Sequence, residues 1–222
     1  MTPKNSMFSS VTKKIIMGLS GLFLILFLIV HCGLNALVFL NDGGETFLHA
    51  AHFMGTNPLM RTLEIGLVVG FLVHIFDGLY LWYQNKKARP VDYNYINASK
   101  NSTWYSRSMG LLGTILLFFL IIHASDFWIP NRMNQFMTGE EINLFEKMSE
   151  EFKNPIIVLV YVFACFSLFW HLLHGFKSAF QSLGLNHSKY NGLIHNIGVL
   201  FSIIVPLLFA IMPIAFYLNL IK

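Results

Sequence analysis

The stretch that decides the fold is residues 155–178, PIIVLVYVFACFSLFWHLLHGFKS. It is longer than the roughly 20 helical residues that cross an apolar bilayer core about 30 Å thick. Its only charged residue is Lys177, near the end, yet its second half carries two histidines, His171 and His174. Lipid cannot satisfy exposed backbone N–H and C=O groups, so such a run must be helical. The segment therefore predicts a membrane-spanning helix with imidazoles inside the apolar layer.

Four other apolar runs have a similar length, at residues 15–40, 61–83, 108–130 and 194–220. Of the 222 residues, 55% are hydrophobic and 12% are charged, whereas soluble domains carry about 25% charged residues. The first run is too long for the apolar part of a signal peptide and lacks a small-residue cleavage site. We therefore predict an all-α integral membrane protein, a bundle of five transmembrane helices that forms one domain over residues 1–222.

Basic residues are distributed unequally between the two ends of the predicted bundle. The N-terminal tail, loop 84–107 and loop 177–193 carry ten lysines and arginines, against five at the other end, where most acidic residues lie. The positive-inside rule then predicts a cytoplasmic N-terminus. The net charge of +4 reflects this topology and not a nucleic-acid-binding surface. The acidic loop 131–154 predicts a short amphipathic helix at the outer surface.

Five of the nine histidines lie inside predicted spans and away from the span ends: His31, His74, His123, His171 and His174. Ionisable residues in a bilayer are costly and mark functional sites, although single histidines also serve as hydrogen-bonding groups between helices. At ~1.5 Å per residue, the first and third spans place their histidines in the outer half, and the second and fourth in the inner half, with levels ~10 Å apart. Two imidazoles at each level predict two bis-histidine haem b sites.

Other residues bear on the same hypothesis. The two cysteines lie in apolar runs and form neither CxxCH nor CxxC, so c-type haem attachment is excluded and Cys-based zinc or iron–sulfur sites are not expected. Small residues at i, i+4 spacing, such as Gly66, Gly70 and Gly78 around His74, predict a smooth helix face for a flat macrocycle or for another helix. Cationic candidates for haem propionates are Lys177, Arg107 and Lys86 near the inner end, with Arg61 and Arg132 near the outer end.

The segment HLLHGFKSAFQSLG at residues 171–184, together with one histidine in each of the first four spans, resembles the cytochrome b anchor subunit of succinate dehydrogenase/fumarate reductase. The resemblance is to the single-chain, two-haem b558 type, in particular its Bacteroidetes-like branch. Spacing alone does not choose between His171 and His174, but in that family the ligand stands four residues before a glycine, here Gly175. The resemblance then makes His171 the ligand and His174 its neighbour, and pairs His31 with His123.

The resemblance also implies function. Such subunits lie in the bacterial cytoplasmic membrane, dock a flavoprotein and an iron–sulfur protein on the cytoplasmic face, and pass electrons between them and a quinone, usually menaquinone. It allows a dimer of the whole complex. Some relatives carry a proton-transferring carboxylate two residues before the fourth-helix ligand; Phe169 stands there, so that path is not expected.

Quinone chemistry couples electrons to protons, so an acid or base near the outer haem is expected. Asp126 and Glu64 are the candidates, with Glu45 and His49 behind them. Asp77 follows His74 by one turn and is a candidate for orienting that region or meeting a partner subunit.

Two other functions remain open from the residues: a haem b anchor of a hydrogenase or formate dehydrogenase, and a histidine-lined transporter, which requires broken helices and further polar groups.

Overall fold

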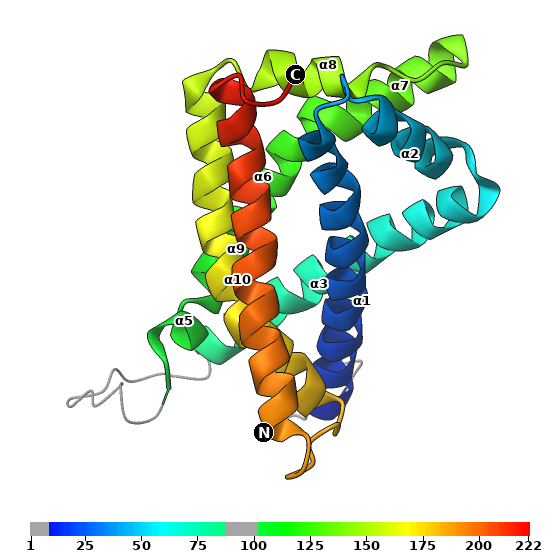
Figure 1. The fold of residues 1–222 in the computed structure, drawn as a ribbon. Coiled ribbons are helices and arrows are strands. Elements are labelled where there is room, and N and C mark those ends of the chain that lie inside the picture. Colours follow the sequence, from blue (N-terminus) through cyan, green and yellow to red (C-terminus); the bar gives the residue numbers. More distant parts are fainter. Residues whose placement is uncertain (1–8, 88–101) are drawn as a thin grey trace.

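The computed structural model describes residues 9–87 and 102–222, and every regular element in these ranges is a helix (Figure 1). The long helices are α1 (Ser10–Ala36), α3 (Pro58–Lys87), α6 (Met109–His123), α9 (Pro155–Ser182) and α10 (Asn191–Tyr217). The short ones are η1 (Leu37–Leu40), α2 (Glu45–Thr56), α5 (Trp104–Arg107), η2 (Ala124–Trp128), α7 (Ile129–Thr138) and α8 (Leu144–Glu151).

Five helical stretches are long and apolar enough to cross a membrane: Val11–Leu40, Pro58–Lys87, Met109–Thr138, Pro155–Ser182 and Asn191–Tyr217. The predicted fold class, an all-α membrane bundle with five transmembrane helices, is confirmed. Several ends differ from the predicted ones by three or four residues. Most lie beyond the apolar run, because helical hydrogen bonding continues until a cap stops it, whereas the fifth stretch ends at Tyr217, before the predicted residue 220. The third stretch differs most: α6, η2 and α7 follow one another without a break and extend the helix to Thr138 instead of residue 130.

The helix ends are stabilised by side chains that the sequence supplies locally. Asn154 accepts a hydrogen bond from the backbone N–H of Ile156, and Pro155 occupies the first turn of α9, where its missing N–H has no cost. Gly139 ends α7 with φ +81°, a left-handed conformation that favours glycine. The long spans therefore begin and end at specific residues and not merely where hydrophobicity fades.

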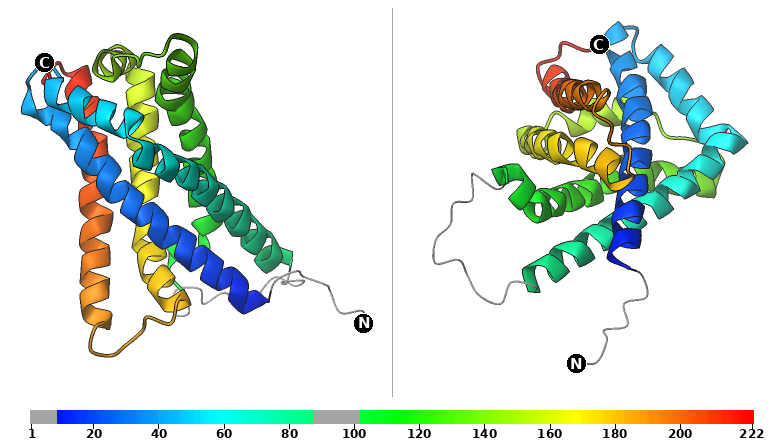
Figure 2. Two further views of the ribbon diagram at one scale, coloured as in Figure 1. Left: turned by 90° about the vertical axis from the view of Figure 1, so that its right-hand side faces the viewer. Right: turned by 90° about the horizontal axis from the view of Figure 1, so that it is seen from below.

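α9 is the central helix, in contact with α1, α6 and α10, whereas α3 contacts α1 and α6 and contains no fully buried residue. Figure 2 shows α3 along the margin of the bundle. Buried apolar side chains form one cluster at the end that holds the C-terminus, including Val38, Phe152 and Phe216. A smaller cluster, Ile25, Leu172 and Phe176, joins α1 and α9. Apolar packing thus ties α1, α9 and α10 together, and α3 adds no buried residue to it.

The short helices α2, α7 and α8 gather around one end of the bundle together with the C-terminus, while α1 begins at the opposite end (Figure 1). We call the end with the C-terminus the outer end, after the predicted topology. The predicted amphipathic helix is present there as α8, whose Met148 is buried in the outer apolar cluster together with Phe152 just beyond the helix. Lys4 and the loop residues Arg89 and Lys100, which entered the topology prediction, lie outside the described residues.

Candidate functional site

Four histidines on four different helices meet in two pairs. His31 of α1 lies against His123 at the end of α6, with ring centroids 5.8 Å apart and planes at 84°. His74 of α3 lies against His171 of α9, with centroids 6.2 Å apart and planes at 69°. We call these the outer pair and the inner pair. The pairing is the one expected from the depths of the histidines and from the family resemblance.

The spacing within each pair suits two imidazoles on opposite sides of one metal. Taking about 2 Å for the bond from an imidazole nitrogen to a metal, as for zinc, and about 1 Å more to the ring centroid, two opposed rings have centroids about 6 Å apart. An iron held by a porphyrin takes only axial ligands from the protein. In residues 9–87 and 102–222 no group of three or more His, Cys, Asp or Glu is placed to hold a metal ion.

The two pairs lie at different heights along the helices. Ser20 contacts His74 of the inner pair, and His31 of the outer pair stands eleven residues further along α1; at ~1.5 Å per residue this is about 16 Å. Tyr161 contacts His123, and His171 stands ten residues further along α9, about 15 Å. The separation exceeds the ~10 Å derived from the sequence, because that value was measured from approximate span ends.

The surroundings of the inner pair fit a ligand that is larger than a side chain. Nδ1 of His171 is buried and has no hydrogen-bond partner among the described residues. Two glycines border the pair: a methyl group on Gly21 would lie 3.8 Å from Cε1 of His74, and one on Gly113 would lie 3.8 Å from Cε1 of His171. The small residues beside both rings and the unpartnered buried nitrogen of His171 are compatible with a flat macrocycle at this pair.

The serine beside His74 constrains the position of the imidazole proton. The Oγ of Ser20 donates to the carbonyl oxygen of Met17 at 3.2 Å and lies 3.2 Å from Nδ1 of His74. A hydroxyl has one proton to donate; with that proton on the carbonyl of Met17, Nδ1–H of His74 donates to Oγ and the Nε2 lone pair is available. A hydrogen bond at one ring nitrogen commonly sets the tautomer of a metal-binding histidine in this way.

The predicted glycine row on α3 has two different environments. Methyl groups on Gly70 and Gly78 would meet Phe23 and Met17 of α1, so these glycines serve close helix packing. Gly66, and Gly175 on α9, have no described atom within 4 Å of such a methyl group. The expectation of one continuous smooth face beside His74 is therefore correct only in part.

His174, the alternative ligand, is not part of the inner pair. Its ring lies 6.4 Å from the ring of Tyr105 on α5, and Tyr105 stacks on Trp170 at 5.3 Å. Nε1 of Trp170 is buried and has no partner among the described residues. Tyr105, Trp170 and His174 thus form an aromatic cluster between α5 and α9, which the sequence did not reveal because α5 is only one turn long.

The outer pair is held by aromatic rings and by polar contacts. Phe27 stacks on His31 at 5.0 Å, and Phe119 stacks on His123 at 5.6 Å. Asn35, one turn after His31, donates to the carbonyl oxygen of His31 at 2.8 Å. The stacked phenylalanines precede their histidines by four residues on the same helix, so the sequence contained this signal.

A chain of hydrogen bonds links the outer pair to Asp126. The hydroxyl of Tyr161 donates to Oδ2 of Asp126 at 2.9 Å and lies 3.4 Å from Nδ1 of His123. Asp126 belongs to η2, a π-helical turn directly after His123; such turns insert a residue into a helix and often occur at functional sites. Asp126 thus lies near the outer pair, as expected from the sequence. Its connection to His123 runs through the hydroxyl of Tyr161, a residue that the sequence analysis did not single out.

The second quinone candidate, Glu64, is already bound to cations. Its two carboxylate oxygens accept from Nε and Nη2 of Arg132 at 2.9 and 2.8 Å, and Oε1 also accepts from Nε1 of Trp128 at 2.6 Å. Arg61 donates to the same carboxylate. The two arginines considered for haem propionates therefore pair with Glu64 instead, and the group joins α3 to α7.

The remaining candidates lie apart from the two pairs. Arg107 donates to the carbonyl oxygen and Oγ of Ser102 at 2.5 and 3.2 Å. Lys177 is exposed and lines a hollow of about 140 Å³ at the inner end, and Lys86 lies over the ring of Trp82. Oδ2 of Asp77 is buried and has no partner among the described residues. None of the described contacts joins Arg107 or Lys177 to a histidine of the two pairs.

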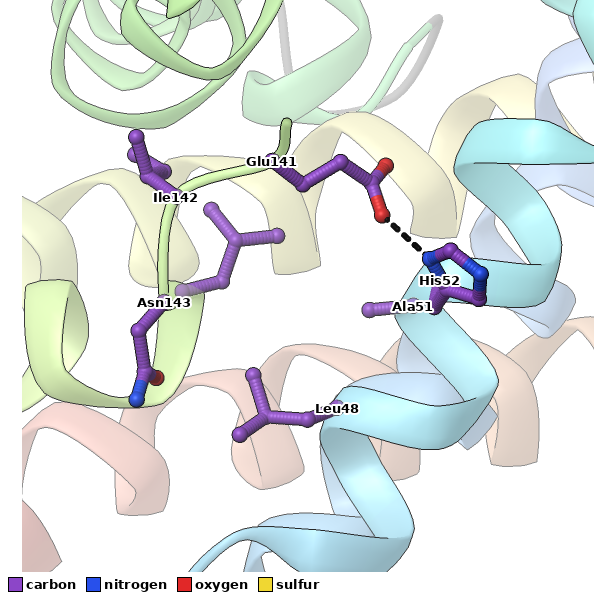
Figure 3. A pocket seen from close by; sticks show the side chains of 7 residues that line it. Leu48, Ala51, His52, Glu141, Ile142 and Asn143 are labelled. Atoms are coloured by element: carbon purple, nitrogen blue, oxygen red, sulfur yellow. Dashed lines mark hydrogen bonds and ion pairs between the residues drawn. The ribbon is translucent and has the colours of Figure 1, made fainter. Parts of the chain in front are cut away.

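A hollow of about 260 Å³ opens at the outer end between α2 and the segment before α8 (Figure 3). It is lined by Leu48, Ala51, His52, Glu141, Ile142, Asn143 and Leu144. His52 and Glu141 form an ion pair across it at 2.9 Å. The quinone candidates Glu45 and His49 are exposed residues of α2 and do not line it.

Comparison with known proteins gives one match of consequence. No protein-family model and no solved structure matches the chain. The chain is 27% identical over 161 residues to the succinate dehydrogenase cytochrome b558 subunit of Bacillus subtilis (strain 168), a similarity that covers 72% of this chain and 73% of that protein. The match supports the family indicated by the histidine layout: this five-helix chain is similar to a succinate dehydrogenase cytochrome b membrane subunit.

Proposed function

We propose that this chain is the membrane anchor and electron conduit of a succinate:quinone oxidoreductase, a succinate dehydrogenase or fumarate reductase. The observation that carries the proposal is the meeting of four intramembrane histidines in two pairs at two heights. The similarity to a succinate dehydrogenase cytochrome b558 subunit supports it. Two haem b groups, one at each pair, would supply one-electron carriers at two depths of the bilayer.

The residues of this chain hold and shield these groups. His31 and His123 of the outer pair would hold one haem, and His74 and His171 of the inner pair would hold the other. Each pair lies in an apolar bundle, where the imidazoles stay neutral because ionised groups are costly there. His174 acts as a neighbour of the inner ligand through the aromatic cluster that it shares with Trp170 and Tyr105.

The inner end is the docking side for a flavoprotein and an iron–sulfur subunit in this proposal. Described cations at or near that end come from four helices and the loop between α9 and α10: Lys13, Lys14, Lys86, Lys87, Arg107, Lys177 and Lys189. An inner surface of this charge also follows the positive-inside rule, so the N-terminus lies in the cytoplasm of a bacterium. The assembly of two such complexes into a dimer belongs to the same proposal.

The quinone, menaquinone in this type, reacts at the outer end near Asp126. The carboxylate lies one hydrogen bond from Tyr161 and two from His123, so it is placed to exchange protons close to the outer haem. Glu64 is the weaker candidate, because two arginines and Trp128 already neutralise and bind its carboxylate.

The test is haem content and partner identity in the native membrane complex. Purified complex should contain two b haems per chain and a flavoprotein with an iron–sulfur subunit. His31→Ala or His123→Ala should remove one haem, and His74→Ala or His171→Ala should remove the other, as judged by haem quantitation and redox difference spectra. The same loss from His31→Ala and His74→Ala, or no loss, contradicts the assignment.

The identity of the partners separates the alternatives. Co-purification with a hydrogenase or formate dehydrogenase points to an anchor of that complex. A chain that is correctly inserted, supplied with haem and still free of it favours the histidine-lined transporter.

A further inference from the structure

The outer pair differs from the inner pair in what lies behind one of its imidazoles. Behind His123 stand a tyrosine hydroxyl at 3.4 Å and, 2.9 Å beyond it, the carboxylate of Asp126. Behind His74, among the described residues, stands the serine hydroxyl of Ser20, which donates to a backbone carbonyl. A carboxylate at the end of such a chain makes the two pairs chemically unequal.

The direction of the hydrogen bonds follows from the number of protons available. The hydroxyl of Tyr161 has one proton, and its shorter contact, 2.9 Å to Oδ2 of Asp126, takes that proton because a carboxylate can only accept. Toward Nδ1 of His123 the same oxygen is therefore an acceptor. The imidazole then carries its proton on Nδ1, and its Nε2 lone pair is free.

Packing keeps the hydroxyl in this position. Tyr161 is only 6% exposed, and its ring is enclosed by Phe119 at 4.9 Å and Phe152 at 5.1 Å, both edge to face. These contacts come from α6 and from the end of α8, so two other elements hold the ring of Tyr161 in place on α9. A buried hydroxyl that loses its partners incurs a desolvation penalty, which favours the arrangement with both hydrogen bonds made.

We propose that Tyr161 is a positioning residue for the outer haem ligand: it fixes His123 with Nε2 toward the iron and transmits the negative charge of Asp126 to the imidazole. This inference rests on the proposed function. A hydrogen-bonded carboxylate behind a metal-binding histidine raises the basicity of the ligand and orients its ring. A more basic ligand stabilises the ferric over the ferrous state. The hydrogen bonds from His123 through Tyr161 to Asp126 therefore lower the reduction potential of the outer haem.

The experiment is potentiometric titration of both b haems in the purified complex, in its native subunit composition. Tyr161→Phe keeps the ring and its packing and removes only the hydroxyl. We expect the reduction potential of one haem to rise by a tenfold change in its ferric–ferrous equilibrium, about 59 mV for one electron, while the other haem is unchanged. Tyr217→Phe, an exposed tyrosine on α10, is the matched control and should leave both potentials unchanged.

The variant Asp126→Asn tests whether the carboxylate acts on the haem potential through the hydroxyl of Tyr161 or directly through its charge. This variant should also raise the potential of the same haem, but in the Tyr161→Phe background it should add little, because the connection is already broken. Full additivity of the two substitutions overturns the proposed bridge. So does an unchanged potential in Asp126→Asn, which retains Tyr161 and its packing and therefore remains informative if Tyr161→Phe fails to assemble.

Failure of this inference and failure of the proposed function give different results. A wild-type complex with two haems whose potentials do not respond to these substitutions overturns the bridge alone. A wild-type complex without b haem overturns the proposed function.

Discussion

Glu64 joins two helices that otherwise share few contacts, and its replacement should weaken the outer end of the bundle. The carboxylate accepts a bidentate pair of hydrogen bonds from Arg132 and a further one from Trp128. α3 has no buried residue of its own, so this group is its main polar attachment to α7. We expect Glu64→Gln to destabilise the protein because the amide presents N–H groups to the guanidinium.

The magnitude follows from how far the pair is buried. Hydrogen bonds to charged groups contribute about 1.5–3 kcal/mol, and breaking a fully buried ion pair costs about 3–5 kcal/mol. The side chains of Glu64 and Arg132 remain 20% and 19% exposed, so water and lipid headgroups partly resolvate the arginine. We therefore expect a loss of about 2–3 kcal/mol in the free energy of unfolding, below the fully buried value. At about 2–4 °C per kcal/mol this lowers the thermal midpoint by roughly 4–12 °C.

The assay is thermal unfolding of the purified protein in detergent, for Glu64→Gln, Arg132→Gln and the double variant. Residues in contact show non-additive effects, so the double variant should lose little more than either single one. Glu45→Gln replaces an exposed glutamate at the same end and should change stability by less than about 0.5 kcal/mol. Equal midpoints for Glu64→Gln and wild type, or full additivity, would refute this reasoning. If Glu64→Gln has the same thermal midpoint as wild type but a raised KM for quinone, Glu64 belongs to the quinone site.

Three further perturbations test separate parts of the structure. Gly113→Leu should lower the content of one haem and spare the other, because the added side chain enters the space beside His171; haem quantitation measures this. Hydrogen bonds from Thr46 hold the pKa of Asp42 below its ordinary value of 3.8, so the ionised Asp42 beside the start of α2 stabilises the fold above that pH, and its contribution is lost as pH falls through the lower folded value. Thermal midpoints of wild type and Asp42→Asn should therefore differ at neutral pH and converge in acid. Gly139→Ala should cost about 1 kcal/mol in thermal stability, because the C-cap of α7 has positive φ.

The five spans and the histidine pairs follow from the sequence because each depends on short-range patterns. A run of about 20 apolar residues specifies a helix across the bilayer without reference to any other segment. Once the helices are antiparallel neighbours, the position of a histidine within its run fixes its depth. His31 and His123 therefore share a level before any contact is known.

What the sequence does not reveal depends on contacts between distant residues. Glu64 and Arg132 are 68 positions apart, and each alone looks like an interfacial anchor of one helix. The π-helical turn at η2 has no compositional signature, yet it sets where Asp126 stands relative to His123. Tyr161 sits in an apolar run that reads as lipid-facing or core, so only the contact with His123 gives the hydroxyl a role.

The heights of the two pairs are set by register within single helices. On α1, the eleven residues from Ser20 to His31 make three turns plus about 20°, so both side chains project from nearly the same face. On α9, the ten residues from Tyr161 to His171 fall about 80° short of three turns, so Tyr161 projects toward the end of α6 while His171 projects toward α3. A change of one residue in either interval would turn one contact by about 100° away from its pair. Each interval therefore places a side chain that contacts one pair and a histidine of the other pair, so neither pair can shift along the bundle without the other.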